Sequence, residues 1–222
     1  MHNVRVSALQ RSRAVSVPCA ALLAAAALML AGCSSGSQPQ AVKKSPSPSP
    51  SPTSTSTVSV PAGVSLTDQG SKLSFGDSAT VIFEADQDRG TVLKLTAKNA
   101  TKGRVGDLSG FVLDDATRRS TPYYVHVSVS NVGQGDLGGG PVPLYGVDAN
   151  NTLLPPASFT SPFKPCPSQP LPKHFGPGDS LRTCLVFLAP SHGTMTAVSY
   201  RPDQAFDPIT WTGTIGTEKK HH

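Results

Sequence analysis

The fold of this chain is decided by residues 123–132, which read YYVHVSVSNV. Successive side chains of a β-strand point to opposite faces, so hydrophobicity that repeats every two residues predicts a strand with one buried face. The side chains that we expect to point inward are Tyr123, Val125, Val127 and Val129. The alternate positions hold Tyr124, His126, Ser128 and Ser130. The pattern therefore predicts a strand whose second face is mostly polar.

Similar runs, separated by turn signals, lie on both sides of this strand. We expect further strands at residues 79–85, 90–97, 181–188, 195–200 and 209–211. The run from Cys184 to Leu188 is apolar at every position, which is typical of a central strand. Turns are marked by sequences such as Phe75-Gly76-Asp77 and Pro177-Gly178-Asp179. Short strands at this spacing predict an all-β, antiparallel sandwich over residues 63–216.

Helical periodicity is almost absent from this domain. Residues 107–119 predict one short helix, centred on Leu108, Phe111 and Val112. We expect Trp211 and Tyr123 to pack in the core, since large aromatic rings bury most apolar area.

The N-terminal 32 residues have the pattern of a signal peptide. Three arginines and no acid precede an apolar run, Ala20–Leu30, which is too short to span a bilayer. Leu30-Ala31-Gly32-Cys33 matches the bacterial lipobox, in which the cysteine thiol receives a diacylglycerol and becomes the mature N-terminus. We therefore expect residues 1–32 to be removed and Cys33 to anchor the chain in the outer face of the cell membrane. An ordinary signal peptide with an incidental cysteine is the alternative.

Residues 33–62 have a composition that does not form a core. They include the run SPSPSPSPTSTST at 45–57, which favours an extended, disordered stalk, because it has too little apolar surface to offset the entropy of ordering. Whether the stalk carries O-linked sugars is left open. Residues 217–222, with His221 and His222, are expected to form a disordered tail.

The remaining cysteines indicate an oxidising compartment. Cys19 leaves with the leader and Cys33 is lipidated, so Cys166 and Cys184 are left as a pair. In an exported domain such a pair is most simply a disulfide, and two free buried thiols are the alternative.

The net charge of +5 is a poor guide to partners. Removal of Arg5, Arg11 and Arg13 with the leader lowers it to +2, and no stretch interleaves aromatic with basic residues. We therefore predict no nucleic-acid partner.

Motifs that carry catalysis or bind metals are missing from the sequence. HExxH, GxSxG and CxxC do not occur, so we predict no catalytic residue, no cofactor and no metal site. His126 is expected to face solvent, whereas His174 and His192 leave open a weak metal or proton site in neighbouring loops. Asp86-Gln87-Asp88 is similar to the start of a calcium loop but lacks the later ligands, so a solvated turn is the simpler interpretation.

Four segments together resemble a known family. They are Phe75–Val81, Val125–Gly133, Phe175–Ser180 and Cys184–Pro190. Their order resembles the immunoglobulin-like domain of unknown function found in lipoproteins of Gram-positive bacteria and actinobacteria, a group related to small secreted mycobacterial antigens. The resemblance covers residues 70–212 and implies an immunoglobulin-like β-sandwich. Residues 134–173, which are rich in proline, depart from the family pattern.

The predicted function is a non-enzymatic binding or adaptor module at the cell envelope. We expect a monomer that contacts an envelope protein or glycan through loops 133–145 and 162–177, with Tyr124 and Tyr145 as surface aromatics. A passive structural protein is one alternative. The other is a hydrolase of envelope polymers, which would need a pocket with His174 or His192 beside a carboxylate.

Overall fold

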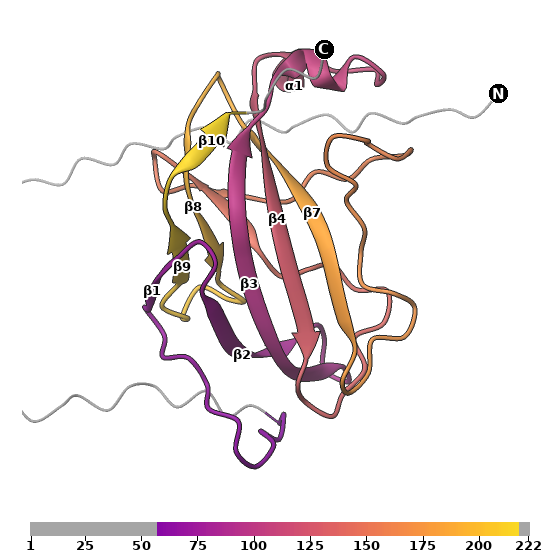
Figure 1. Ribbon diagram of the computed structural model, residues 1–222, viewed down its shortest axis with the longest axis vertical. Coiled ribbons are helices and arrows are strands. Elements are labelled where there is room, and N and C mark those ends of the chain that lie inside the picture. The colour runs from indigo at the N-terminus through magenta and orange to yellow at the C-terminus, as the bar shows by residue number, and fades with distance from the viewer. Residues whose placement is uncertain (1–56, 218–222) are drawn as a thin grey trace, which may run out of the picture. The chain divides into compact units, whose positions relative to one another are not determined.

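Two packed β-sheets make up the domain (Figure 1). The computed structural model describes residues 57–217. Sheet I has the order β1 (Lys72–Ser74), β9 (Ile209–Thr212), β8 (Met195–Tyr200), β5 (Tyr145–Asp148) and β6 (Leu153–Leu154). Sheet II has the order β10 (Ile215–Thr217), β3 (Gly90–Lys102), β4 (Thr121–Asn131) and β7 (Ser180–Ala189), and β2 (Ser78–Glu84) also pairs with β3. The prediction of a mostly β protein with two packed sheets is confirmed.

The pairing is antiparallel except at two edges. β1 runs parallel to β9, and β10 runs parallel to β3, so the prediction of a wholly antiparallel sandwich is wrong there. Each of these edge strands adjoins a change of sheet, β1 to β2 in one case and β9 to β10 in the other, which are two of the five changes of sheet along the chain.

These two crossings lie side by side. The Phe75 N–H donates a hydrogen bond of 2.9 Å to the carbonyl of Thr212. Gly213, with a φ of +155°, makes the second crossing, and a Cβ there would lie 2.9 Å from the Phe75 ring. A side chain at this position would therefore separate the two crossings.

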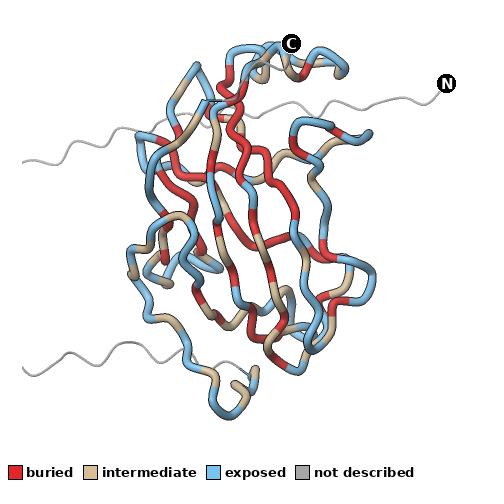
Figure 2. The backbone as a smooth tube through the Cα atoms, viewed as in Figure 1, coloured by how far each residue is buried: buried red, intermediate tan, exposed pale blue. Residues whose placement is uncertain are grey.

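The main core lies between the sheets. Its largest fully buried side chains are Trp211, Tyr123, Tyr200, Phe175 and Phe187. The predicted burial of Trp211 and Tyr123 is confirmed, and the Trp211 indole donates to the Asp77 carbonyl at 3.0 Å. Along β4, Val125, Val127 and Val129 are buried while His126 is exposed, which confirms the inward-and-outward alternation (Figure 2).

The segment between β3 and β4 holds two short helical turns instead of one helix. They are the 3-10 turn Val105–Leu108 and α1, Asp115–Arg118. Val112, expected at the centre of the helix, is fully exposed, while Leu108 is buried as expected. Asp114 starts α1 because its side chain accepts the Thr117 N–H, which places the helix start after Val112.

The N-terminal boundary differs from the expected one. Residues 57–62, assigned to the stalk from composition, contact the domain: the Thr57 N–H donates to Glu84 Oε1 at 3.2 Å. The predicted leader 1–32, the lipidation site Cys33, the stalk up to residue 56 and the tail residues 218–222 lie outside the described residues. Within residues 57–217, no helix has the length and apolar character needed to cross a bilayer.

Candidate functional site

The outer face of sheet II is divided into two halves. Near the end where β4 begins, side chains from two loops cover it, and we call this the covered half. Its buried members are Leu108, Tyr124, Phe163, Cys166, Cys184 and Val186. Phe111 and Phe159 pack on Phe163 with ring centroids 6.1 and 5.0 Å away. The covered half is thus a second apolar core outside the sandwich.

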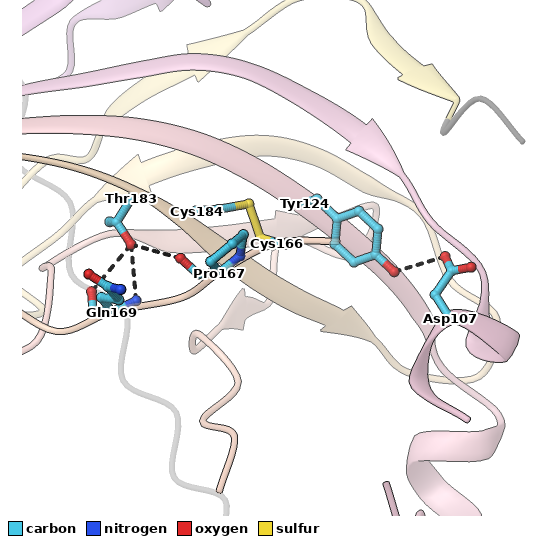
Figure 3. Close-up of a disulfide and its surroundings, with 7 residues drawn as sticks. All are labelled: Asp107, Tyr124, Cys166, Pro167, Gln169, Thr183 and Cys184. Atoms are coloured by element: carbon cyan, nitrogen blue, oxygen red, sulfur yellow. Dashed lines mark hydrogen bonds between the residues drawn. A yellow bond between two sulfur atoms is a disulfide. The ribbon is translucent and has the colours of Figure 1, made fainter. Parts of the chain in front are cut away.

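The disulfide joins this cover to the sheet (Figure 3). Cys166, in the loop before β7, is bonded to Cys184 on β7, with a Cα–Cα distance of 5.2 Å. Thr183, next to Cys184, accepts the Gln169 N–H at 3.0 Å, so the same loop is held at two points. The predicted disulfide is confirmed.

Tyr124 belongs to the covered half, and its predicted surface position is wrong. Its exposure is 1%, because Phe163 packs edge-on against the ring at 5.5 Å. The hydroxyl donates to Asp107 Oδ2 at 2.9 Å, which satisfies the one polar atom of the side chain (Figure 3). Tyr145, the other predicted surface aromatic, is half-buried on β5.

The two predicted recognition loops are anchored by buried side chains. Loop 162–177 buries Phe163, Cys166, Leu171 and Phe175, and loop 133–145 buries Leu137, Val142 and Leu144. These loops therefore cover the ends and edge of the sandwich over much of their length.

The other half of the outer face is open to solvent. Two adjoining hollows lie along it and share Lys98, and no carboxylate lines either of them. We call this surface the open half. Its cationic or titratable side chains, all exposed, are Lys94, Lys98, His126 and Arg182.

Strand register arranges the open half in two rows. One row crosses four strands as Ser78, Thr96, Ser128 and Arg182. The next row crosses them as Thr80, Lys94, Ser130 and Ser180. Cross-strand hydroxyl pairs join Ser78 to Thr96 and Ser180 to Ser130, each at 2.8 Å. Each row therefore holds three hydroxyl side chains and one cation.

The cations of the open half have no anionic partner within residues 57–217. The ion pairs of this part of the chain join Arg89 to Asp86, Arg118 to Asp115, and His174 to Asp136. None includes Lys94, Lys98 or Arg182. The open half consequently carries uncompensated positive charge.

Sequence reasoning missed this surface, although its signal was present. The outward positions of the strands at 90–97 and 123–132 hold lysine, threonine, serine and histidine. The sequence predicts recognition on loops, because only the strand register brings Lys94, Ser130 and Ser180 into one row.

A polar hub fixes the loops at the opposite end of β4 from the cover. The buried Asn131 amide donates to the carbonyls of Gly135 and Phe175, and its oxygen accepts from Thr91 Oγ1 at 2.8 Å. Asp136 accepts the N–H groups of Phe175 and Gly138, and these bonds, with His174 nearby, hold the pKa of the Asp136 carboxyl below its usual value. The hub joins the two loops to each other.

His174 lies beside a carboxylate, but it lines neither hollow of the open half. Its Nδ1 is 3.4 Å from Asp136 Oδ2, and the side chain is 92% exposed. Asp136 Oδ1 accepts the N–H groups of both Phe175 and Gly138, which gives this carboxylate a structural role. His192 is exposed, at a φ of +55°.

In the calcium-like turn, the Asp86 carboxylate binds groups of the same turn. Asp86 pairs with Arg89 at 2.7 Å and accepts the N–H groups of Asp88 and Arg89. The side-chain hydrogen bond from Arg89 is the largest cause of the lowered pKa of the Asp86 carboxyl. Within the described part of the chain, no group of three or more His, Cys, Asp or Glu residues is placed to hold a metal ion.

Comparison of the chain with protein-family models, curated proteins and solved structures finds no match.

Proposed function

We propose that this protein is an exported lipoprotein whose β-sandwich is a non-enzymatic binding module at the cell envelope. The lipobox at residues 30–33, after a basic segment and a short apolar run, supports lipidation at Cys33 and attachment to the outer face of the cell membrane. A buried disulfide supports folding in an oxidising compartment.

An immunoglobulin-like fold is part of this proposal. Two packed sheets, mostly antiparallel pairing and a strand at Ser180–Ala189 that follows the turn Pro177-Gly178-Asp179 support it. The fold gives no activity by itself, so the function rests on the surface chemistry.

The open half is the observation that carries the binding role. Unpaired cations beside a ladder of hydroxyl groups, on a rigid sheet, form a surface suited to binding and not to covalent chemistry. The only histidine–carboxylate ion pair within residues 57–217, His174 with Asp136, lies in exposed loops away from this surface.

The experiment compares four forms of the full chain expressed in a bacterium that processes lipoproteins. They are the wild type, Cys33→Ala, an open-half variant (K94Q/K98Q/R182Q) and a control variant (K72Q/K164Q/K173Q). The control removes the same charge from exposed lysines that line neither hollow.

Labelled fatty acid should be incorporated into the wild type, the open-half variant and the control variant. The Cys33→Ala protein should be released from the membrane unlabelled. After surface crosslinking, the wild type and the control should recover the same envelope component, and the open-half variant should not. Equal recovery by all lipidated forms would refute the open half as the binding surface, and recovery of nothing by any form would favour a passive role.

A further inference from the structure

The open half has the chemistry of a surface for a polymer that carries both negative charge and many hydroxyl groups. Resting on the binding role proposed above, we propose that it binds an extended anionic glycopolymer, made of sugar or polyol units that bear phosphate or carboxylate groups. Four observations on the described residues lead to this class of partner.

The first observation is the sign of the charge. Lys94, Lys98 and Arg182 are exposed, form no ion pair within residues 57–217, and share the surface with no carboxylate. An anion that binds here displaces only water and mobile counterions, without breaking an ion pair of the protein. Charge complementarity therefore selects an anionic partner.

The second observation is the spacing of the cations. Lys94 and Lys98 lie four residues apart on β3, and the bulge between Ala97 and Asn99 brings their separation to about 10–13 Å. Lys94 and Arg182 lie two strands and two residues apart, about 12 Å over the sheet. Side chains stand roughly perpendicular to a sheet, so one phosphate or carboxylate meets one cation at a time. A chain with repeated anionic groups can contact several cations at once and gain by multivalency.

The third observation is the hydroxyl ladder. Within the pair Ser78–Thr96, and within Ser180–Ser130, one hydroxyl donates to the other and leaves a second hydrogen free to donate outward. Ser128 lies between these pairs in the register. Such an array exchanges hydrogen bonds with the hydroxyl groups of sugars or polyols.

The fourth observation excludes competing partners. No Phe, Tyr or Trp lines either hollow, so the open half lacks the large aromatic rings on which nucleic-acid bases usually stack. Among residues 57–217 the exposed large hydrophobic side chains are Leu66 and Val112, and neither lines the hollows. A lipid surface or a protein hot spot would engage such apolar anchors.

The test measures binding of the purified full chain to immobilised probes. Poly(glycerol phosphate) and alginate represent the proposed class, and dextran represents a neutral glycopolymer. Single-stranded DNA and phosphatidylglycerol vesicles represent the competing anions. The wild type should bind the two anionic glycopolymers and not dextran, and binding should weaken as salt rises.

The open-half variant K94Q/K98Q/R182Q should bind the anionic glycopolymers at least tenfold more weakly. The control K72Q/K164Q/K173Q should bind within about twofold of the wild type, because exposed charges contribute to binding mainly where the polymer contacts them. Circular dichroism and thermal unfolding establish that both variants fold.

The outcomes separate this inference from the proposed function. If the wild type binds vesicles or DNA more tightly than the glycopolymers, and only the open-half variant loses that binding, the binding surface stands and the glycopolymer class is wrong. If both variants bind the glycopolymers as the wild type does, the assignment of the open half as their site is wrong. If the wild type binds no probe, the inference is overturned, and the crosslinking experiment above still decides the binding role.

Discussion

The two halves of the outer face of sheet II are built on the same strands and have opposite chemistry. Over the covered half, β4 and β7 present Tyr124, Cys184 and Val186 to a second apolar cluster. Over the open half, the same strands present Ser128, Ser130 and Arg182 to water. The change occurs between Tyr124 and His126, two outward residues in succession.

This difference shows that the outward positions of a strand have no fixed environment. The cover comes from two segments. Residues 105–113 are separated from β4 by α1, and residues 157–166 follow β4 at a distance in the sequence. Where apolar outward residues meet these segments, burial is favourable, and where hydroxyl groups and cations stand, dehydration would cost free energy. The cover therefore ends where the polar outward residues begin.

The largest expected effect comes from removing the centre of the covered half. Phe163→Ala deletes a ring that is 3% exposed and contacts Phe111, Tyr124 and Phe159. We expect the free energy of unfolding to fall by about 3–5 kcal/mol. Ser128→Ala on the open half should change it by less than about 0.5 kcal/mol. Urea unfolding followed by tryptophan fluorescence measures both, and equal losses would contradict the contrast between the halves.

Removing the disulfide should come next in size. The bridge spans 18 residues in sequence, so Cys166→Ser with Cys184→Ser should cost about 3 kcal/mol by the loop-entropy relation. Binding by the open half should stay within about twofold, because Cys184 lies at its boundary and carries no charge. Thermal unfolding of oxidised and double-serine proteins gives the first value. A loss of binding comparable to that of K94Q/K98Q/R182Q would show that the halves are coupled.

A smaller effect is expected from crowding the cover. A Cβ at Gly103 would lie 2.4 Å from the Tyr124 ring, whereas a Cβ at Gly110, in the same segment, meets no heavy atom within 4 Å. Gly103→Ala should therefore destabilise by about 1–3 kcal/mol. Gly110→Ala is the matched control and should stay near the wild type. If the two alanines cost the same, the packing of Tyr124 over Gly103 is wrong.

The smallest effect concerns one hydrogen bond. Tyr124→Phe removes the donor to Asp107 and keeps the ring, so we expect a loss of about 1 kcal/mol. Tyr145→Phe is the comparison on sheet I, where the Tyr145 hydroxyl forms no hydrogen bond within residues 57–217, and it should be close to neutral. Chemical denaturation of both variants under one set of conditions measures the two changes in the free energy of unfolding. A neutral Tyr124→Phe would mean that the hydrogen bond adds no net stability, because water satisfies Asp107 equally well in the variant.

The inward side of the fold was predictable from the sequence, and the outward side was not. Period-two hydrophobicity located β2, β4 and β8 closely, because their inward residues meet a core whatever the rest of the chain does. The three-residue strands β1 and β10 and the two-residue β6 are too short to show a period. The parallel pairings of β1 and β10 depend on where the chain crosses between the sheets.

Tyr124 illustrates the limit of the prediction for the site. Its position in the alternation is outward, as predicted, yet the loop that carries Phe163 reaches it from about 40 residues further along the chain. The pairing of Cys166 with Cys184 was predictable because only two cysteines remained to pair. The arrangement of Lys94, Ser130 and Ser180 needed the strand register, which a single sequence does not give.

The burial of the disulfide has a kinetic consequence. Cys166 is 0% and Cys184 2% exposed, and exchange requires a thiolate to approach a sulfur atom directly. A reductant therefore acts only during excursions in which the loop lifts off β7, and these excursions need not unfold the sandwich. The rate at which excess thiol cleaves the bridge under native conditions would thus report how often this layer of the protein opens.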